Sequence, residues 1–197
     1  MKPIQRNEVL DLGEYEAIRP RFRARVIEEK KRRRVAVGAE ATAVFENRDT
    51  VLLQIQEMLR TERITRESGI AHEMETYNAQ IPGENELSCT LMIAELPERE
   101  ERDTKLRDLR GVEKTVGLWV DGERYGAVID PKFLLEDQAS AVMFLKFPLS
   151  PGAAKAIREA GAGQGTHAIE LRIEHQAYRA TAALGREVLA SVAEDLG

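Results

Sequence analysis

The stretch that decides the fold runs from Lys30 to Arg60, KKRRRVAVGAEATAVFENRDTVLLQIQEMLR. It joins five basic residues, a predicted hairpin and the clearest amphipathic helix in the chain. Asn47 or Asp49 can cap the start of that helix by accepting a bond from a free backbone N–H. With successive residues about 100° apart, one arc of the helix is apolar, as expected when one side is buried. The residues on this arc are Val51, Leu52, Ile55, Met58 and Leu59.

One apolar residue of this helix does not fit that arc. Leu53 falls on the opposite side, beside Glu57 and Arg60. Two interpretations follow: either the helix is covered on both sides, or Leu53 contacts a partner. Leu53 and Arg60 are therefore candidate partner-binding residues.

A short hairpin is predicted ahead of the helix. Val35–Val37 and Val44–Phe45 have the β-branched and aromatic character of strands, and Gly38 and Glu40 lie where the turn would be. The hairpin would place three polar side chains near its ends, namely Arg34, Asn47 and Arg48.

The basic run from Lys30 to Arg34 has two interpretations. Cations at the end of a helix complement its dipole and remain in solvent. Guanidinium groups in pairs also hold phosphate or carboxylate oxygens. The second interpretation predicts an anion site, with arginines clamping the anion, Glu57 orienting it and His175 as acid or base. Its candidate ligand-binding residues are Lys31, Arg33, Arg34, Asn47, Arg48, Glu57 and Tyr178.

Composition indicates a globular protein. The 197 residues are 43% hydrophobic, enough for a substantial core, and we expect one domain over 1–197 with an N-terminal helical arm over 1–33 packed on it. The net charge of -5 disfavours nucleic acid as the main partner, since that binding depends on neutralising phosphates. Residues 1–40 nevertheless carry +4, so a local anionic ligand is compatible with the sequence.

The cellular compartment is predicted from the absence of sequence signals for secretion and membrane insertion. A single cysteine forms no internal disulfide, and the first twelve residues contain no apolar core of signal-peptide length. No run of eighteen apolar residues predicts a transmembrane helix. We expect a cytoplasmic protein that does not bind membranes.

The remaining pattern predicts an α+β fold: a mainly antiparallel sheet of about six to seven strands with helices packed against it. Leu87–Glu95 is uncharged on both faces until its end and is the expected central strand. Asp121-Gly122 suits the two-residue turn of a hairpin. The strands are expected near Val35, Val44, Leu91, Leu118, Ala127, Phe144 and Leu171.

Helices are expected in five further places. Pro20 should divide the N-terminal arm into two helical pieces, because proline breaks a helix interior. Pro97 should open a charged helix that only Leu106 and Leu109 anchor. The other predicted helices start near Ser68, Ser150 and Gly185.

The titratable residues form no catalytic or metal motif. His72-Glu73 begins like a zinc-protease helix, but Thr76 stands where the second histidine ligand belongs. Cys89 lies on an apolar strand face, where burial suppresses reactivity. His175 ends an alternating strand and is the candidate acid or base, although such a histidine is more often a rim residue bonded to backbone. No metal site or cofactor is predicted.

Six segments resemble, in order and over nearly the whole chain, a bacterial family known as domain of unknown function 3501: KKRRRVAVG (Lys30 to Gly38), FENRDT (Phe45 to Thr50), QEMLR (Gln56 to Arg60), YNAQIP (Tyr77 to Pro82), TLMIAE (Thr90 to Glu95) and HQAY (His175 to Tyr178). The chain departs from the family pattern at Gln176, where proline commonly follows the histidine. The resemblance implies members encoded beside rubrerythrin-like and iron-sulfur oxidoreductase proteins, and hence a part in peroxide or electron-transfer metabolism.

Three functions remain at this point. The first is an accessory protein that binds a partner, such as a redox enzyme or a second copy of the chain, through the cationic segment and the helix face around Leu53. The second is an enzyme or sensor for a small anionic metabolite. The third, binding of nucleic acid by the basic arm, is disfavoured by the acidic total charge.

Overall fold

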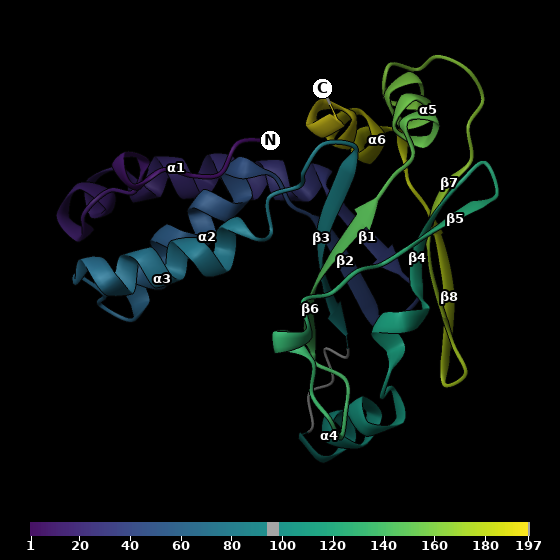
Figure 1. Cartoon of the computed structure of the whole chain (residues 1–197), viewed down its shortest axis with the longest axis horizontal. Coiled ribbons are helices and arrows are strands. Elements are labelled where there is room, and N and C mark those ends of the chain that lie inside the picture. Colours follow the sequence, from purple (N-terminus) through teal and green to yellow (C-terminus); the bar gives the residue numbers. More distant parts are fainter. Residues whose placement is uncertain (94–98, 197) are drawn as a thin grey trace.

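The computed structural model describes residues 1–93 and 99–196. Eight strands are present in this part of the chain: β1 (Arg34–Val37), β2 (Ala41–Phe45), β3 (Glu86–Ile93), β4 (Val116–Val120), β5 (Glu123–Gly126), β6 (Val142–Pro148), β7 (Ile169–His175) and β8 (Tyr178–Ala183). The same residues form six α-helices: α1 (Leu12–Arg32), α2 (Arg48–Thr61), α3 (Glu67–Asn78), α4 (Arg99–Asp108), α5 (Pro151–Gly161) and α6 (Arg186–Ala193). The α+β class is confirmed (Figure 1).

The segment from Lys30 to Arg60 forms the predicted hairpin and helix. β1 and β2 form an antiparallel hairpin that turns at Gly38, whose φ is +74°. A side chain at Gly38 would also collide with the Tyr178 hydroxyl, so both the backbone conformation and the available space require glycine. Asn47 caps α2, because its side chain accepts the Thr50 N–H at 3.0 Å while the Thr50 hydroxyl accepts the Asn47 N–H at 2.9 Å.

The strands form two four-stranded antiparallel sheets, in the orders β1-β2-β3-β6 and β5-β4-β7-β8. The expectation of one sheet with six to seven strands is wrong in both respects. β8, with the sequence YRATAA, was missed because its half-buried positions are mainly alanine, which gives a weak alternating signal. The strand expected near Ala127 ends at Gly126, and Val128 forms only an isolated bridge to Lys146 of β6.

The two sheets enclose one hydrophobic core, with β3 paired on both sides as predicted. At one end of the sheets lie α5 and α6, and at the opposite end lies α4 (Figure 1). The predicted anchors of α4, Leu106 and Leu109, are both buried. Pro97, the predicted start of this helix, lies outside the described residues. Asp121 and Gly122 have φ of +51° and +86°, which confirms the predicted tight turn.

The first three helices form a second hydrophobic cluster that projects to one side of the sheets (Figure 1). α1 is one continuous helix with Pro20 inside it, contrary to the predicted break. Proline removes one backbone donor and crowds the carbonyl four residues before it, but α1 is anchored on both sides of Pro20 by the fully buried Tyr15 and Val26. Ile4 and Val9, which precede α1 in the arm, are buried in this cluster with residues of α2 and α3, and α1 itself packs on α2.

Leu53 is buried within this helical part, with 8% of its surface exposed. Glu57, one turn further along α2, bonds to Tyr15 and Arg19 of α1. Residues four apart share a helix face, so α1 covers the face that carries Leu53. The first interpretation holds: α2 is covered on both sides, and the expectation of an exposed partner-binding leucine is wrong.

Candidate functional site

Arg33 is an internal anchor in this structure. Its side chain is fully buried and donates to both carboxylate oxygens of Asp195, at 2.6 and 2.8 Å. It also donates to Glu29 at 2.7 Å and to the Ser191 carbonyl at 3.0 Å. Burial opposes the charge, but the two carboxylates keep the pKa of Arg33 above its ordinary value. The network ties the end of α1 to the C-terminal segment and leaves Arg33 inaccessible to a ligand.

Two other predicted ligand residues also join parts of the chain. Arg48 donates to the Lys2 carbonyl at 3.0 Å and pairs with Glu8, which fastens the N-terminal segment to α2. Glu57 accepts two bonds from Arg19, at 2.7 and 2.9 Å, and one from the Tyr15 hydroxyl at 2.6 Å. The bonds from Arg19 are the main reason that the pKa of Glu57 falls to about 2.

Asn47 and Arg60 have structural partners as well. Besides capping α2, Asn47 donates through its side-chain amide to Glu29 at 3.3 Å. Arg60 donates to Glu16 of α1 at 2.6 Å, and this pair is partly exposed. Arg60 therefore adds an ion pair between α1 and α2 to those of Arg19 with Glu57 and of Arg25 with Asp49.

His175 forms two backbone hydrogen bonds and is 7% exposed. Its Nδ1 accepts the Ala177 N–H at 3.2 Å, so the proton of the neutral ring sits on Nε2, which donates to the Arg110 carbonyl at 3.2 Å. Neither nitrogen keeps a lone pair for a substrate proton. The geometry is that of a rim histidine bonded to backbone, and it gives no support to a general base.

Tyr178 closes the β1–β2 turn onto β8. Its hydroxyl donates to the Val37 carbonyl at 2.6 Å and accepts the Glu40 N–H at 3.1 Å. Lys105 pairs with Glu40 at 2.7 Å and lies over the Tyr178 ring. Tyr178 therefore holds β1 near β8 at one end of these two strands.

The predicted anion clamp does not form. Arg33 contacts the C-terminal segment, Arg48 the N-terminal segment, Glu57 helix α1, and His175 the carbonyl of Arg110. Each of these side chains is held by a different part of the chain, because intramolecular carboxylates and carbonyls have taken the place of the expected ligand. Of the predicted ligand-binding residues, Lys31 and Arg34 alone line a common depression.

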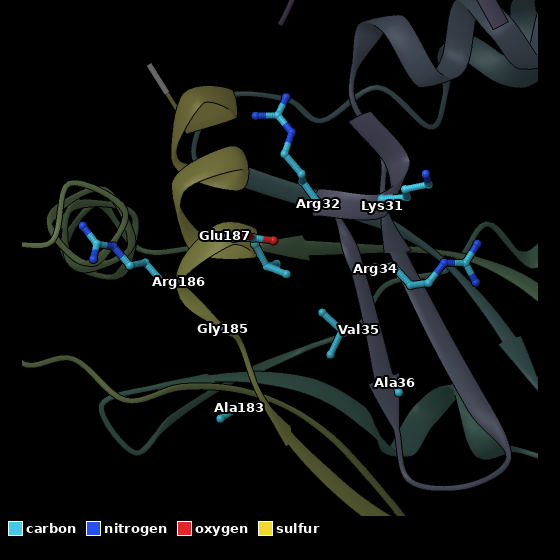
Figure 2. Close-up of a pocket in the computed structure, with 10 residues that line it drawn as sticks. Lys31, Arg32, Arg34, Val35, Ala36, Ala183, Gly185, Arg186 and Glu187 are labelled. Carbon is cyan, nitrogen blue, oxygen red and sulfur yellow. The ribbon is translucent and has the colours of Figure 1, made fainter. Parts of the chain in front are cut away.

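This depression, which we call the β1 groove, has a volume of about 400 Å³. Its walls come from the end of α1, the strand β1, the end of β8 and the first turn of α6 (Figure 2). It is lined by Lys31, Arg32, Arg34, Val35, Ala36, Ala183, Gly185, Arg186, Glu187 and Val188. Only Lys31 and Arg34 of these were predicted from the sequence. The predictions missed Arg32, Val35 and Ala36 beside them, and also the last five, which belong to a distant part of the chain and carry no motif.

The backbone edge of β1 faces this groove. The Phe45 N–H donates to the Arg33 carbonyl at 3.0 Å, and the antiparallel ladder alternates from there, so Val35 and Val37 bond to β2. The N–H and C=O groups of Arg34 and Ala36 therefore point outward. No backbone hydrogen bond joins β1 to β8 anywhere in the described chain. The two edges lie side by side but unpaired.

The rim of the groove is cationic. Lys31 and Arg32 pair with glutamates of α1, whereas Arg34 and Arg186 have no ion-pair partner among the described residues. Figure 2 shows Arg34 and Arg186 extending in opposite directions, away from the centre of the groove, and Glu187 lying between them. Cations that diverge in this way cannot chelate one small anion, but they can meet separate acidic groups on a larger surface.

The described residues contain no group of three or more histidine, cysteine or acidic side chains placed to hold a metal ion. Cys89 is buried, and desolvation raises the pKa of its thiol, as the packing interpretation predicts. None of the helices that the structure describes has the length and apolar character needed to span a bilayer.

Fold and groove together define an α+β protein with two antiparallel sheets, in which the unpaired edge of β1 borders a groove. The chain belongs to the family described as protein of unknown function DUF3501, whose model matches residues 3–196. A crystal structure of a novel protein of unknown function from Burkholderia pseudomallei is similar over 100% of both chains, with 34% identity and a TM-score of 0.89. No curated protein matches the chain.

Proposed function

We propose that this protein is an accessory binding protein that takes an extended acidic segment of a partner protein along the free edge of β1. The observation that carries the proposal is the outward-facing backbone of Arg34 and Ala36, unpaired and open to a groove with a cationic rim. An exposed strand edge is a template for another strand, and main-chain hydrogen bonds supply the affinity.

Charge specifies the partner. The groove lining has four basic side chains and a single acidic one, Glu187, although the whole chain carries -5. An added strand beside β1 would place acidic side chains opposite Arg34, where cross-strand ion pairs contribute roughly 0.2–1 kcal/mol each. The genomic neighbours implied by the family resemblance make a rubrerythrin-like protein or an iron-sulfur oxidoreductase the first partner to test.

A small anionic metabolite is the second candidate. One observation favours it: no side chain caps the start of α6, and its N-cap Gly185 and the following Arg186 line the groove, where the free N–H groups of a helix start attract anions. Glu187 already supplies negative charge to this helix start. The diverging arginines also favour the partner segment over the small anion (Figure 2).

The test uses fluorescence anisotropy with a labelled peptide of alternating glutamate and valine, against a matched lysine–valine peptide. Arg34→Glu should weaken binding of the acidic peptide about tenfold at low salt, corresponding to about 1.4 kcal/mol. Arg21→Glu is the matched control, since Arg21 is exposed on α1 and distant in sequence from every lining residue. Equal loss in both variants would show that only the total charge matters.

A second variant tests the strand edge itself. Ala36→Pro removes the outward N–H while leaving the pairing of β1 with β2 intact, because edge strands accept proline where the N–H faces outward. Binding of the acidic peptide should be lost with little change in thermal stability. Unchanged binding would refute strand addition, and displacement of the peptide by millimolar inorganic phosphate would favour the small anion.

The partner is tested by co-purification with the rubrerythrin-like protein and with the oxidoreductase, each expressed beside the wild-type chain or beside Ala36→Pro. We expect one of them to be retained by the wild type alone. If both forms of the chain retain the partner, the contact lies away from the edge of β1.

A further inference from the structure

A second cavity, which we call the Gln80 pocket, lies on the outer face of the sheet β1-β2-β3-β6. Its volume is about 400 Å³, within the range of roughly 300–1,000 Å³ typical of small-molecule sites. Ser88 and Lys146 are direct cross-strand partners on this face, and Phe144 lies two residues before Lys146. The segment before β6 and the end of α3 complete the walls, which are formed by Ala79, Gln80, Ser88, Val128, Ile129, Asp130, Pro131, Phe133, Phe144 and Lys146.

The pocket is lined by a buried amide without a partner. Gln80 is 4% exposed, and its side-chain Nε2 is buried with no hydrogen-bond acceptor in the described structure. Ser88 is 2% exposed, and no hydrogen bond from its hydroxyl occurs within residues 1–93 and 99–196. A buried amide without a partner destabilises the folded state, so folded proteins rarely keep one. Gln80 and Ser88 both line this cavity.

The rest of the lining is mainly apolar and aromatic. Phe133 and Phe144 meet edge to face, with centroids 5.4 Å apart and ring planes at 75°. Lys146 donates to the Ile81 carbonyl at 3.1 Å and to Glu86 at 2.7 Å, which leaves one of its three donors unused. An aromatic wall beside a few fixed polar groups is the usual composition of a small-molecule site.

We propose that the Gln80 pocket binds a small planar heterocycle with adjacent ring N–H and carbonyl groups. The Gln80 amide has both a donor and an acceptor, so it pairs with such an edge through two hydrogen bonds, as glutamine does with a nucleobase. The ring lies against Phe133 and Phe144, and a second oxygen on the ligand accepts from Ser88 or Lys146. Such a ligand supplies the acceptor that Nε2 lacks.

This site is separate from the β1 groove, since the two share no lining residue. Binding of the heterocycle and binding of the acidic peptide can therefore fail independently. The first test needs no mutation. Calorimetry and ligand-observed NMR measure the affinity of the wild-type chain for 2-quinolone and for N-methyl-2-quinolone. The methyl group removes the ring N–H and leaves the carbonyl and the ring system. We expect 2-quinolone to bind at least tenfold more tightly.

Gln80→Met should change stability and ligand preference in opposite directions. Methionine fills a similar volume without polar atoms, so it should raise the melting temperature while abolishing the preference for 2-quinolone. Gln176→Met, on the exposed turn between β7 and β8, should change neither quantity. Ser88→Ala should not alter the preference, because the single oxygen of 2-quinolone accepts from Gln80. Equal binding of the two quinolones, no binding at millimolar concentration, or a lower melting temperature for Gln80→Met would each overturn the proposal.

Discussion

Replacing Arg33 with methionine should be among the most destabilising single changes in this protein. The side chain is fully buried, and its removal leaves the Asp195 carboxylate, only 2% exposed, without its bidentate partner. Glu29 loses the same cation and is also largely buried. Breaking a buried ion pair from one side costs about 3–5 kcal/mol, because the remaining charge is unpaired and desolvated.

Methionine keeps most of the stem volume of Arg33, so the loss reports the charge rather than a cavity. For a chain of this size each kcal/mol lowers the melting temperature by about 2–4 °C, which predicts a fall of roughly 6–20 °C. Urea unfolding followed by Trp119 fluorescence and by far-UV circular dichroism gives the free energy directly. The double variant Arg33→Met with Asp195→Leu should recover most of the stability lost in the single variant, since no unpaired carboxylate remains at position 195. A loss of unfolding free energy below about 1 kcal/mol in the single variant, or a double variant less stable than the single one, would refute this reasoning.

Three further outcomes follow from the site geometry. Because the pKa of Glu57 is about 2 in the folded chain against an ordinary 4.5, its stabilisation is complete above about pH 4.5 and is lost as the pH falls toward 2. Glu57→Gln should flatten the acid limb of the stability profile by about 1–2 kcal/mol after solvent screening, and an unchanged limb would contradict the assignment. Tyr178→Phe removes the bonds to the Val37 carbonyl and the Glu40 N–H, so it should cost about 1–2 kcal/mol and speed hydrogen exchange in the β1–β2 turn, whereas unaltered exchange would show that the turn holds itself. Cys89 should react with iodoacetamide only after unfolding, because burial raises the pKa of its thiol; rapid labelling of the native protein would disprove its burial.

Much of the local structure could be predicted because its causes are local. The Asn47 cap depends on a side chain and a backbone group three residues apart. The Asp121-Gly122 turn depends on two residues that tolerate positive φ. Strand and helix periodicity likewise depends on neighbours a few positions away. These features required no knowledge of the rest of the chain.

The candidate site was less predictable because charge and burial depend on contacts between distant segments. The basic run at Lys30–Arg34 contains a fully buried anchor, Arg33, next to an exposed rim cation, Arg34. No pattern within the run distinguishes them, since the difference is set by Asp195, 162 positions away. The burial of Leu53 was not predicted for the same reason, because the element that buries it, α1, is remote from it in the sequence.

The sequence by itself determined the α+β class, most helix and strand positions, the hairpin that begins at Arg34 and the family. Tertiary structure alone decided that the strands divide into two sheets, that the edges of β1 and β8 meet without pairing, and that Gln80 is buried beside a cavity. The physical reason is the range of the interactions: caps, turns and periodicity act over a few residues, whereas sheet edges, buried charges and cavities arise only where remote segments pack together.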